Sequence, residues 1–143
     1  WSLPIRTPFP PEEMLSQAAA TVPLIEGLPL SEVRDMLRQD RELVRASGIR
    51  HPDHFVGTFY GEEAVTLENL LAILENLGEG TTELMCHPGL ADEQLLAESI
   101  YGRPREKELE LLCHPRVRDK LDELGIELVN FGALGEGEGQ RTS

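Results

Sequence analysis

The chain has 143 residues, with 13 Lys or Arg against 26 Asp or Glu, and a net charge of −13. This length suits one domain, and a hydrophobic content of 40 % is sufficient for a folded core, so we do not expect disorder throughout. An acidic surface repels phosphate groups, which disfavours nucleic acid and anionic membranes as partners. The sequence contains no apolar run long enough to cross a membrane. Two cysteines without a C-x-x-C pair are typical of a cytoplasmic protein.

Proline, glycine and hydrophobic spacing predict four elements in the first 60 residues. These are an extended segment around Ile5, helices over 12–20 and 32–46, and a strand over 54–59. Ser31 is a favourable N-cap for the helix over 32–46, and Gly48 is well placed to end it.

The remaining residues predict three helices and two strands. The helices cover 67–77, 104–112 and 115–124, and the strands cover 82–86 and 126–131. Thr66 is the expected N-cap of the first of these helices. Residues 90–103 form a long mixed connection, and the acidic, glycine-rich residues 134–143 are expected to be a disordered tail.

Strands that alternate with helices indicate βα units and a mostly parallel sheet, which places the chain in the α/β class. About four strands are expected. A closed (β/α)₈ barrel needs about 200 to 250 residues, so the chain could form roughly half of a barrel or a small open sheet.

His87 is the strongest candidate for chemistry because it directly follows a predicted strand and precedes Pro88. Catalytic groups in parallel α/β folds lie at the carboxyl ends of strands, where a histidine can transfer a proton or bind a metal. The alternative is a turn histidine bonded to the backbone. Glu83 alternates with Met85 and His87, so the three side chains are expected on one face, which in a barrel could be the interior near a site. The alternative for Glu83 is a solvent-facing or salt-bridged side chain. Arg6 follows the extended segment and could also lie at a strand end.

His51 and His54 are separated by three residues, as metal ligands on a helix often are, although Pro52 disfavours a helix there. A metal protein that uses His51, His54 and His87 is therefore one alternative. Asp53 precedes a predicted strand and is either a turn residue or part of a site. His114 lies at a helix start and is expected to cap it.

Residues 83–89, E-L-M-C-H-P-G, resemble a motif of the YdjC/ChbG family of carbohydrate deacetylases, which includes the hopanoid-associated HpnK proteins. Residues 101–109 resemble the S-x-Y…R-E-x-E-L stretch of this family, and residues 53–57 resemble its D-x-F-x-G element. Arg6-Thr7-Pro8 resembles its arginine-containing strand end. The resemblance covers about residues 1–133.

The resemblance implies the C-terminal half of a distorted β/α barrel related to polysaccharide deacetylases, over residues 1–133. It also implies a divalent metal, Mg or Zn, and the removal of an acetyl group from an N-acetylated sugar or chitooligosaccharide. The metal ligands of the family lie in an A-D-D-F-G motif and two histidine motifs that this sequence lacks. We therefore expect no metal ligand in this chain, ligands encoded ahead of Trp1, and little activity of the chain alone.

By the same resemblance, His87 is expected to act as an acid or base or to contact the substrate. Arg6 and Asp53 are expected to orient groups or stabilise charge. Glu83, selected by its place on the predicted strand, is expected to bind the substrate. The protein could form a homodimer. A different class of function, a non-catalytic α/β binding or regulatory domain, is the alternative to the enzyme.

Overall fold

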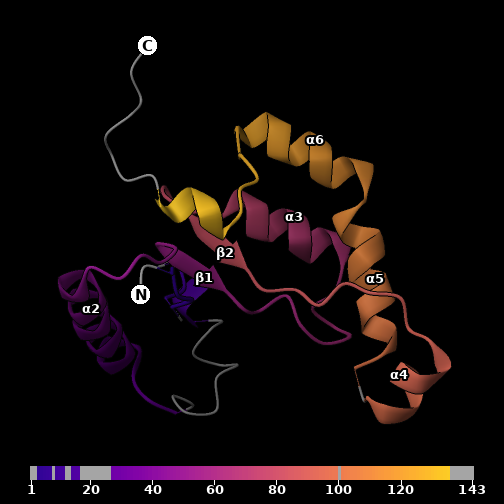
Figure 1. The fold of residues 1–143 in the computed structure, drawn as a ribbon, viewed down its shortest axis with the longest axis horizontal. Helices are drawn as coiled ribbons and strands as arrows, with labels where there is room; N and C mark the ends of the chain where they lie inside the picture. Colours follow the sequence, from indigo (N-terminus) through magenta and orange to yellow (C-terminus); the bar gives the residue numbers. More distant parts are fainter. Residues whose placement is uncertain (1–2, 8, 12–13, 17–26, 100, 136–143) are drawn as a thin grey trace. The chain divides into compact units, whose positions relative to one another are not determined.

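A computed structural model of the chain describes residues 3–7, 9–11, 14–16, 27–99 and 101–135. The chain divides into two compact units, one of residues 1–56, 78–83 and 128–143, and the other of residues 57–77 and 84–127. The elements, in chain order, are α2 (Leu30–Ser47), β1 (His54–Val56), α3 (Leu67–Glu75), β2 (Thr82–Leu84), α4 (Glu93–Glu98), α5 (Arg103–Leu112), α6 (Pro115–Leu124) and the 3₁₀ helix η2 (Phe131–Gly135) (Figure 1).

In the first unit, the predicted extended segment is attached to later residues by single backbone hydrogen bonds. The N–H of Ile5 donates to the carbonyl of Arg50 at 2.8 Å, and the N–H of Phe55 donates to the carbonyl of Phe9 at 2.6 Å. None of the described residues before α2 belongs to a strand. Buried apolar side chains among the described residues of this unit include Phe9, Met14, Leu15, Val33 and Val56.

Two short strands form the sheet, and β1 pairs directly with β2. Each has three residues, so both predicted strands are confirmed in position but are shorter than expected. Helix α3 lies between them in sequence, as in a βα unit. Among the described residues there are two strands rather than the predicted four or so, and the chain is a mixed α/β protein.

The prediction of a strand over 126–131 is wrong. Residues 126–130 have no regular structure, and η2 begins at Phe131. Leu128 is 70 % exposed, and Val129 is also exposed. Alternation of apolar and polar residues produces a strand only where a partner strand pairs with it, and no described strand pairs with this segment.

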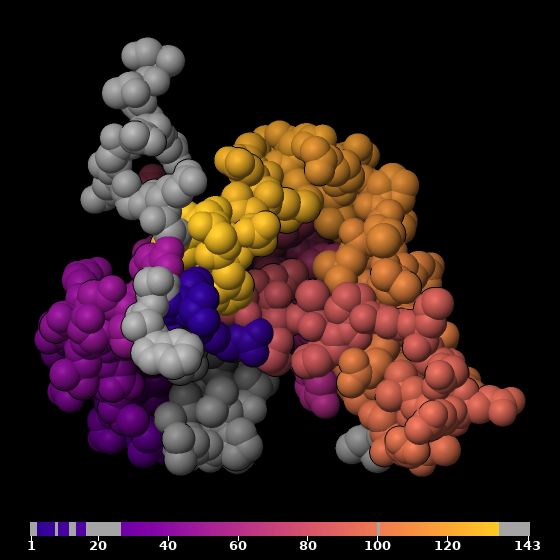
Figure 2. Space-filling view, viewed as in Figure 1, coloured from indigo at the N-terminus to yellow at the C-terminus, as the bar shows by residue number. Residues whose placement is uncertain are grey.

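The second unit is helical, and its core lies between α3 and α6, which pack against each other (Figure 1). The predicted cap of α3 is confirmed, because the Thr66 side chain accepts a hydrogen bond from the N–H of Asn69 at 3.1 Å. Gly125 ends α6 at a positive φ of 66°, a conformation that favours glycine. Helices α5 and α6 form one continuous orange surface in Figure 2. The most buried apolar residues of α3 and α6 are Leu70, Leu71, Ile73, Leu74, Val117 and Leu121.

Three further outcomes concern predicted helices, a predicted connection and the predicted tail. Helix α2 confirms the predicted helix, but its N-cap is Pro29 rather than Ser31, because the helix begins at Leu30. Helix α4 falls in the stretch predicted as a mixed connection, and the Asp92 side chain caps it by accepting from the N–H of Leu95 at 2.8 Å. Most of the predicted helix over 12–20 and residues 136–143 of the predicted tail lie outside the described residues.

Within the described ranges, every helix is too short or too polar to cross a membrane.

Candidate functional site

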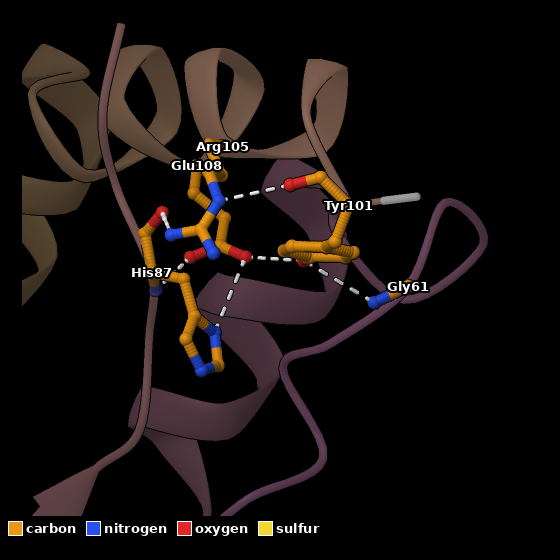
Figure 3. Close-up of polar contacts among 5 residues, drawn as sticks. All are labelled: Gly61, His87, Tyr101, Arg105 and Glu108. Atoms are coloured by element: carbon orange, nitrogen blue, oxygen red, sulfur yellow. Dashed lines mark hydrogen bonds and ion pairs between the residues drawn. The ribbon is translucent and has the colours of Figure 1, made fainter. Parts of the chain in front are cut away.

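Two segments that are distant in sequence are hydrogen-bonded in the second unit: residues 87–91 and the first turns of α5 (Figure 3). Backbone N–H groups of the first segment donate to oxygen atoms of the second. The bonds run from His87 to the Glu108 carboxyl, from Gly89 to the Arg105 carbonyl at 3.2 Å, and from Ala91 to Glu106 Oε1 at 3.1 Å. Two of the four segments that resemble the deacetylase family, residues 83–89 and 101–109, are therefore joined by hydrogen bonds.

Glu108 is the centre of this structure and has no exposed surface. Its Oε2 accepts from the His87 N–H, and its Oε1 accepts from the Tyr101 hydroxyl. The Tyr101 oxygen in turn accepts from the N–H of Gly61 at 3.4 Å. A buried carboxyl is costly unless it is hydrogen-bonded, and these bonds satisfy both of its oxygens.

The His87 ring presents Nδ1 to the same carboxyl, at 4.0 Å from Glu108 Oε1 (Figure 3). Nδ1 is buried and has no hydrogen-bond partner among the described residues. The side chain as a whole is 32 % exposed. Nδ1 therefore lies on the side of the ring that faces the Glu108 carboxyl, and Nε2 is the other ring nitrogen that could contact a ligand.

Two tyrosine rings enclose the histidine. The Tyr101 ring lies edge-on to His87 with centroids 5.8 Å apart, and the Tyr60 ring does so at 5.5 Å. Tyr60 and Tyr101 are stacked, with centroids 4.3 Å apart. We call His87, Tyr60, Tyr101, Arg105 and Glu108 the His87 cluster.

Arg105 contacts the backbone carbonyls of both Tyr101 and His87. Its Nε donates to the Tyr101 carbonyl at 2.9 Å, and its Nη1 lies 3.5 Å from the His87 carbonyl. Its guanidinium also lies 5.8 Å from the centre of the Tyr101 ring. These contacts fix the backbone on either side of the histidine ring.

The Tyr101 phenol gives a testable pH dependence. Burial and the hydrogen bond to Glu108 raise its pKa to about 12, from an ordinary value of about 10. The folded protein thus binds the phenol proton more tightly than the unfolded chain does. This contribution to stability is complete below about pH 10 and is lost as the pH rises through about 12.

Ultraviolet titration of the phenolates should show one of the two tyrosines ionising near pH 12, and Tyr101→Phe should abolish that step. A titration without a step above pH 11 would contradict the buried hydrogen bond.

In the first unit, the structure brings Arg6 and Glu83 together. Arg6 Nε donates to Glu83 Oε1 at 2.7 Å, and the Arg6 guanidinium lies 5.2 Å from the centre of the Phe55 ring. The hydrogen bond to Glu83 raises the pKa of Arg6. The side chain of Arg6 is 53 % exposed and that of Glu83 only 11 %. Glu83 Oε2 is buried without a partner in the described part of the chain.

Asp53 lies in the same unit and stabilises the turn before β2. Its Oδ2 accepts from the N–H of Thr81 at 2.8 Å, and its carbonyl accepts from Arg41 at 3.0 Å. Gly80 has a φ of 100°, and a Cβ there would lie 2.7 Å from Asp53 Oδ2, so this turn requires glycine. This geometry agrees with the turn interpretation of Asp53.

Arg6, Asp53 and Glu83 belong to the first unit, and His87 belongs to the second. The prediction that Glu83 and His87 share a strand face is wrong, because β2 ends at Leu84 and His87 lies outside any strand. The backbone from residue 87 onward bonds to α5 instead of continuing a sheet ladder.

Two of the three histidines of the metal alternative are bonded to the backbone through their rings. His51 Nδ1 donates to the Pro52 carbonyl at 2.7 Å, and His54 Nε2 donates to the Glu79 carbonyl at 3.2 Å. No three His, Cys, Asp or Glu side chains group as metal ligands within the residues that the structure describes. The structure gives no support to a centre built from His51, His54 and His87. His114 caps α6 as predicted, accepting from the N–H of Arg116 at 3.2 Å.

Glu108 and Tyr60 were not among the predicted site residues. A signal for Glu108 was present, since it follows Pro104 by four residues and precedes Leu111 by three, and both of these are buried in α5. This spacing places the carboxyl on the buried face of the helix. For Tyr60, no local pattern indicated a position beside the histidine.

Comparison with known proteins finds a YdjC-like family model and relatives that are named deacetylases. A family model described as YdjC-like protein matches residues 1–123. A carbohydrate deacetylase of Thermoanaerobacter pseudethanolicus is 39 % identical over 66 % of this chain and 38 % of its own length. One from Vibrio campbellii is 32 % identical over 88 % of this chain and 60 % of its own length. A chitooligosaccharide deacetylase of Yersinia enterocolitica is 34 % identical over 76 % of this chain and 45 % of its own length.

A solved structure has a similar fold. It is the structure of a protein from Enterococcus faecalis described as acting in cellobiose-phosphate cleavage, with a TM-score of 0.67 and 27 % sequence identity. The match covers 93 % of this chain and 42 % of that protein. The chain thus spans about half the length of the relatives that it matches.

Proposed function

Since the chain belongs to the YdjC-like family, we propose that it takes part in removing the acetyl group from an N-acetylated sugar. The similarity to proteins named carbohydrate deacetylase and chitooligosaccharide deacetylase supports this proposal. We further propose that residues 1–133 form the C-terminal part of a distorted β/α barrel in a cytoplasmic enzyme. The match of 93 % of this chain to 42 % of a larger solved protein supports the first part of that statement.

The observation that most strongly supports a catalytic role is the orientation of His87. Its Nδ1 faces the buried carboxyl of Glu108, while the side chain retains solvent exposure. In amide hydrolysis, the oxygen of water bonds to the acetyl carbon, the C–N bond breaks, and the amine nitrogen takes up a proton. We assign His87 as the group that supplies this proton through Nε2.

Arg6 and Glu83 are proposed to act on the substrate. Arg6, whose side chain is 53 % exposed, is proposed to orient a group or stabilise charge. Glu83 is proposed to bind the substrate together with Arg6, its ion-pair partner. Asp53 is proposed to act through the turn that it stabilises.

A divalent metal, Mg or Zn, is proposed on the resemblance alone. The described residues do not fit such an ion, because they supply no group of three ligands. We therefore assign no metal ligand and derive no step through a metal from this chain. The ligands are proposed to come from the family motifs that its sequence lacks.

Product analysis on the full-length protein tests the proposed function. Incubation with diacetylchitobiose should release acetate and free amine in equal amounts. Treatment with a strong chelator should abolish this release, and Mg²⁺ or Zn²⁺ should restore it. A folded full-length protein that releases no acetate from N-acetylated sugars would contradict the proposed deacetylase activity and favour the non-catalytic binding domain. Full activity after chelation would contradict the metal dependence but not the deacetylase activity.

A further inference from the structure

We infer that the exposed ring of Tyr60 is a stacking platform for a pyranose ring of the substrate, beside His87. The inference rests on the proposed function, since it assigns a sugar-binding residue to that site. It starts from an unusual placement: Tyr60 is 48 % exposed although it belongs to a cluster whose other tyrosine is buried.

The Tyr60 ring packs against the buried side chain of Tyr101. It is stacked on Tyr101 with an interplanar angle of 19°. The Tyr101 hydroxyl is itself fixed by the Glu108 carboxyl and by the N–H of Gly61, the residue next to Tyr60. Gly61 has a φ of 91°, which other residues rarely adopt. These contacts restrict the Tyr60 ring before a ligand binds, which reduces the entropy lost on binding.

The chemistry of an exposed phenol ring suits a sugar. An aromatic face bears partial negative charge, whereas the C–H groups on one face of a pyranose are weakly positive and apolar. A neutral sugar also suits a chain with a net charge of −13, which would repel an anionic ligand.

The distance to the histidine fits the proposed reaction. The centroids of Tyr60 and His87 lie 5.5 Å apart, and the rings are inclined by 68°. A sugar stacked on the exposed surface of Tyr60 would place its ring substituents next to the histidine edge. Tyr60 would thus select a ring-shaped substrate, while His87 acts on its acetamido group.

Three variants of the full-length protein test the platform. Tyr60→Phe keeps the ring, Tyr60→Leu removes it, and Leu124→Ala is a control of similar exposure in α6. Binding of diacetylchitobiose is measured by saturation-transfer NMR, which needs no turnover. Tyr60→Leu should weaken binding about tenfold, while the other two variants stay within about twofold of wild type.

Binding and turnover separate the two claims. If the protein is active, Tyr60→Leu should raise KM about tenfold and change kcat little, because stacking acts on bound substrate and transition state alike. Equal sugar binding by Tyr60→Leu and wild type would overturn the platform, whatever the activity. So would a folded wild-type protein that does not bind the sugar. Wild-type binding that depends on Tyr60, without acetate release, would support the platform and refute the proposed deacetylation.

Discussion

Replacing Glu108 with alanine is expected to lower the free energy of unfolding by about 3–5 kcal/mol. Glu108 has no exposed surface, and its two oxygens accept from the His87 N–H and the Tyr101 hydroxyl. Alanine would leave these buried donors without acceptors and open a cavity in the helical unit. Urea unfolding of the full-length protein, followed by circular dichroism, measures the loss.

Two controls separate the hydrogen bonds from helix propensity. Glu108→Gln keeps the volume but one acceptor oxygen only, so we expect an intermediate loss of about 1–3 kcal/mol. Glu110→Ala changes an exposed residue of the same helix, where a change below about 0.5 kcal/mol is expected. If Glu108→Ala and Glu110→Ala unfold at the same urea concentration, the buried network does not stabilise the protein.

Replacing His87 with alanine should lower kcat for acetate release by roughly 100- to 10,000-fold, the usual range for a lost general acid. The departing amine would then have to take its proton from water. Metal content should stay unchanged, because His87 is not assigned as a ligand. Steady-state kinetics and elemental analysis of the same preparation measure both quantities.

Matched variants distinguish proton transfer from packing. His87→Gln keeps a polar side chain of similar size but cannot transfer a proton, so it should be as slow as His87→Ala. His114→Asn changes a histidine of the same unit to another residue that caps helices well, and its kcat should equal that of wild type. A fast His87→Gln enzyme would contradict the proton-transfer role.

Helices α2, α3, α5 and α6 could be predicted because their determinants are local, whereas α4 was not predicted. Thr66 caps α3, leucines follow it at helical spacing, and Gly125 ends α6 in the left-handed conformation. The strands were harder, because a strand needs a partner. Residues 126–131 have the right alternation, yet no described strand pairs with them.

At the site too, local features could be predicted, whereas contacts between distant segments could not. A strand end directly before His87 was predicted, although β2 ends at Leu84, and a role for residues 101–109 was predicted from the family resemblance. That these two segments bind each other was not, because the contact depends on a buried carboxyl 21 residues away from His87. Tyr60 reaches His87 through the fold alone, since no sequence periodicity relates them. Arg6 and Glu83, by contrast, were selected separately and proved to be an ion pair.

The most direct test of the proposed proton transfer by His87 is the rate of acetate release per bound metal ion, compared between wild-type and His87→Ala full-length protein. The proposed role predicts equal metal content and a rate per ion that is at least about 100-fold lower in the variant. An unchanged rate per ion, at equal metal content, would show that His87 does not supply the proton.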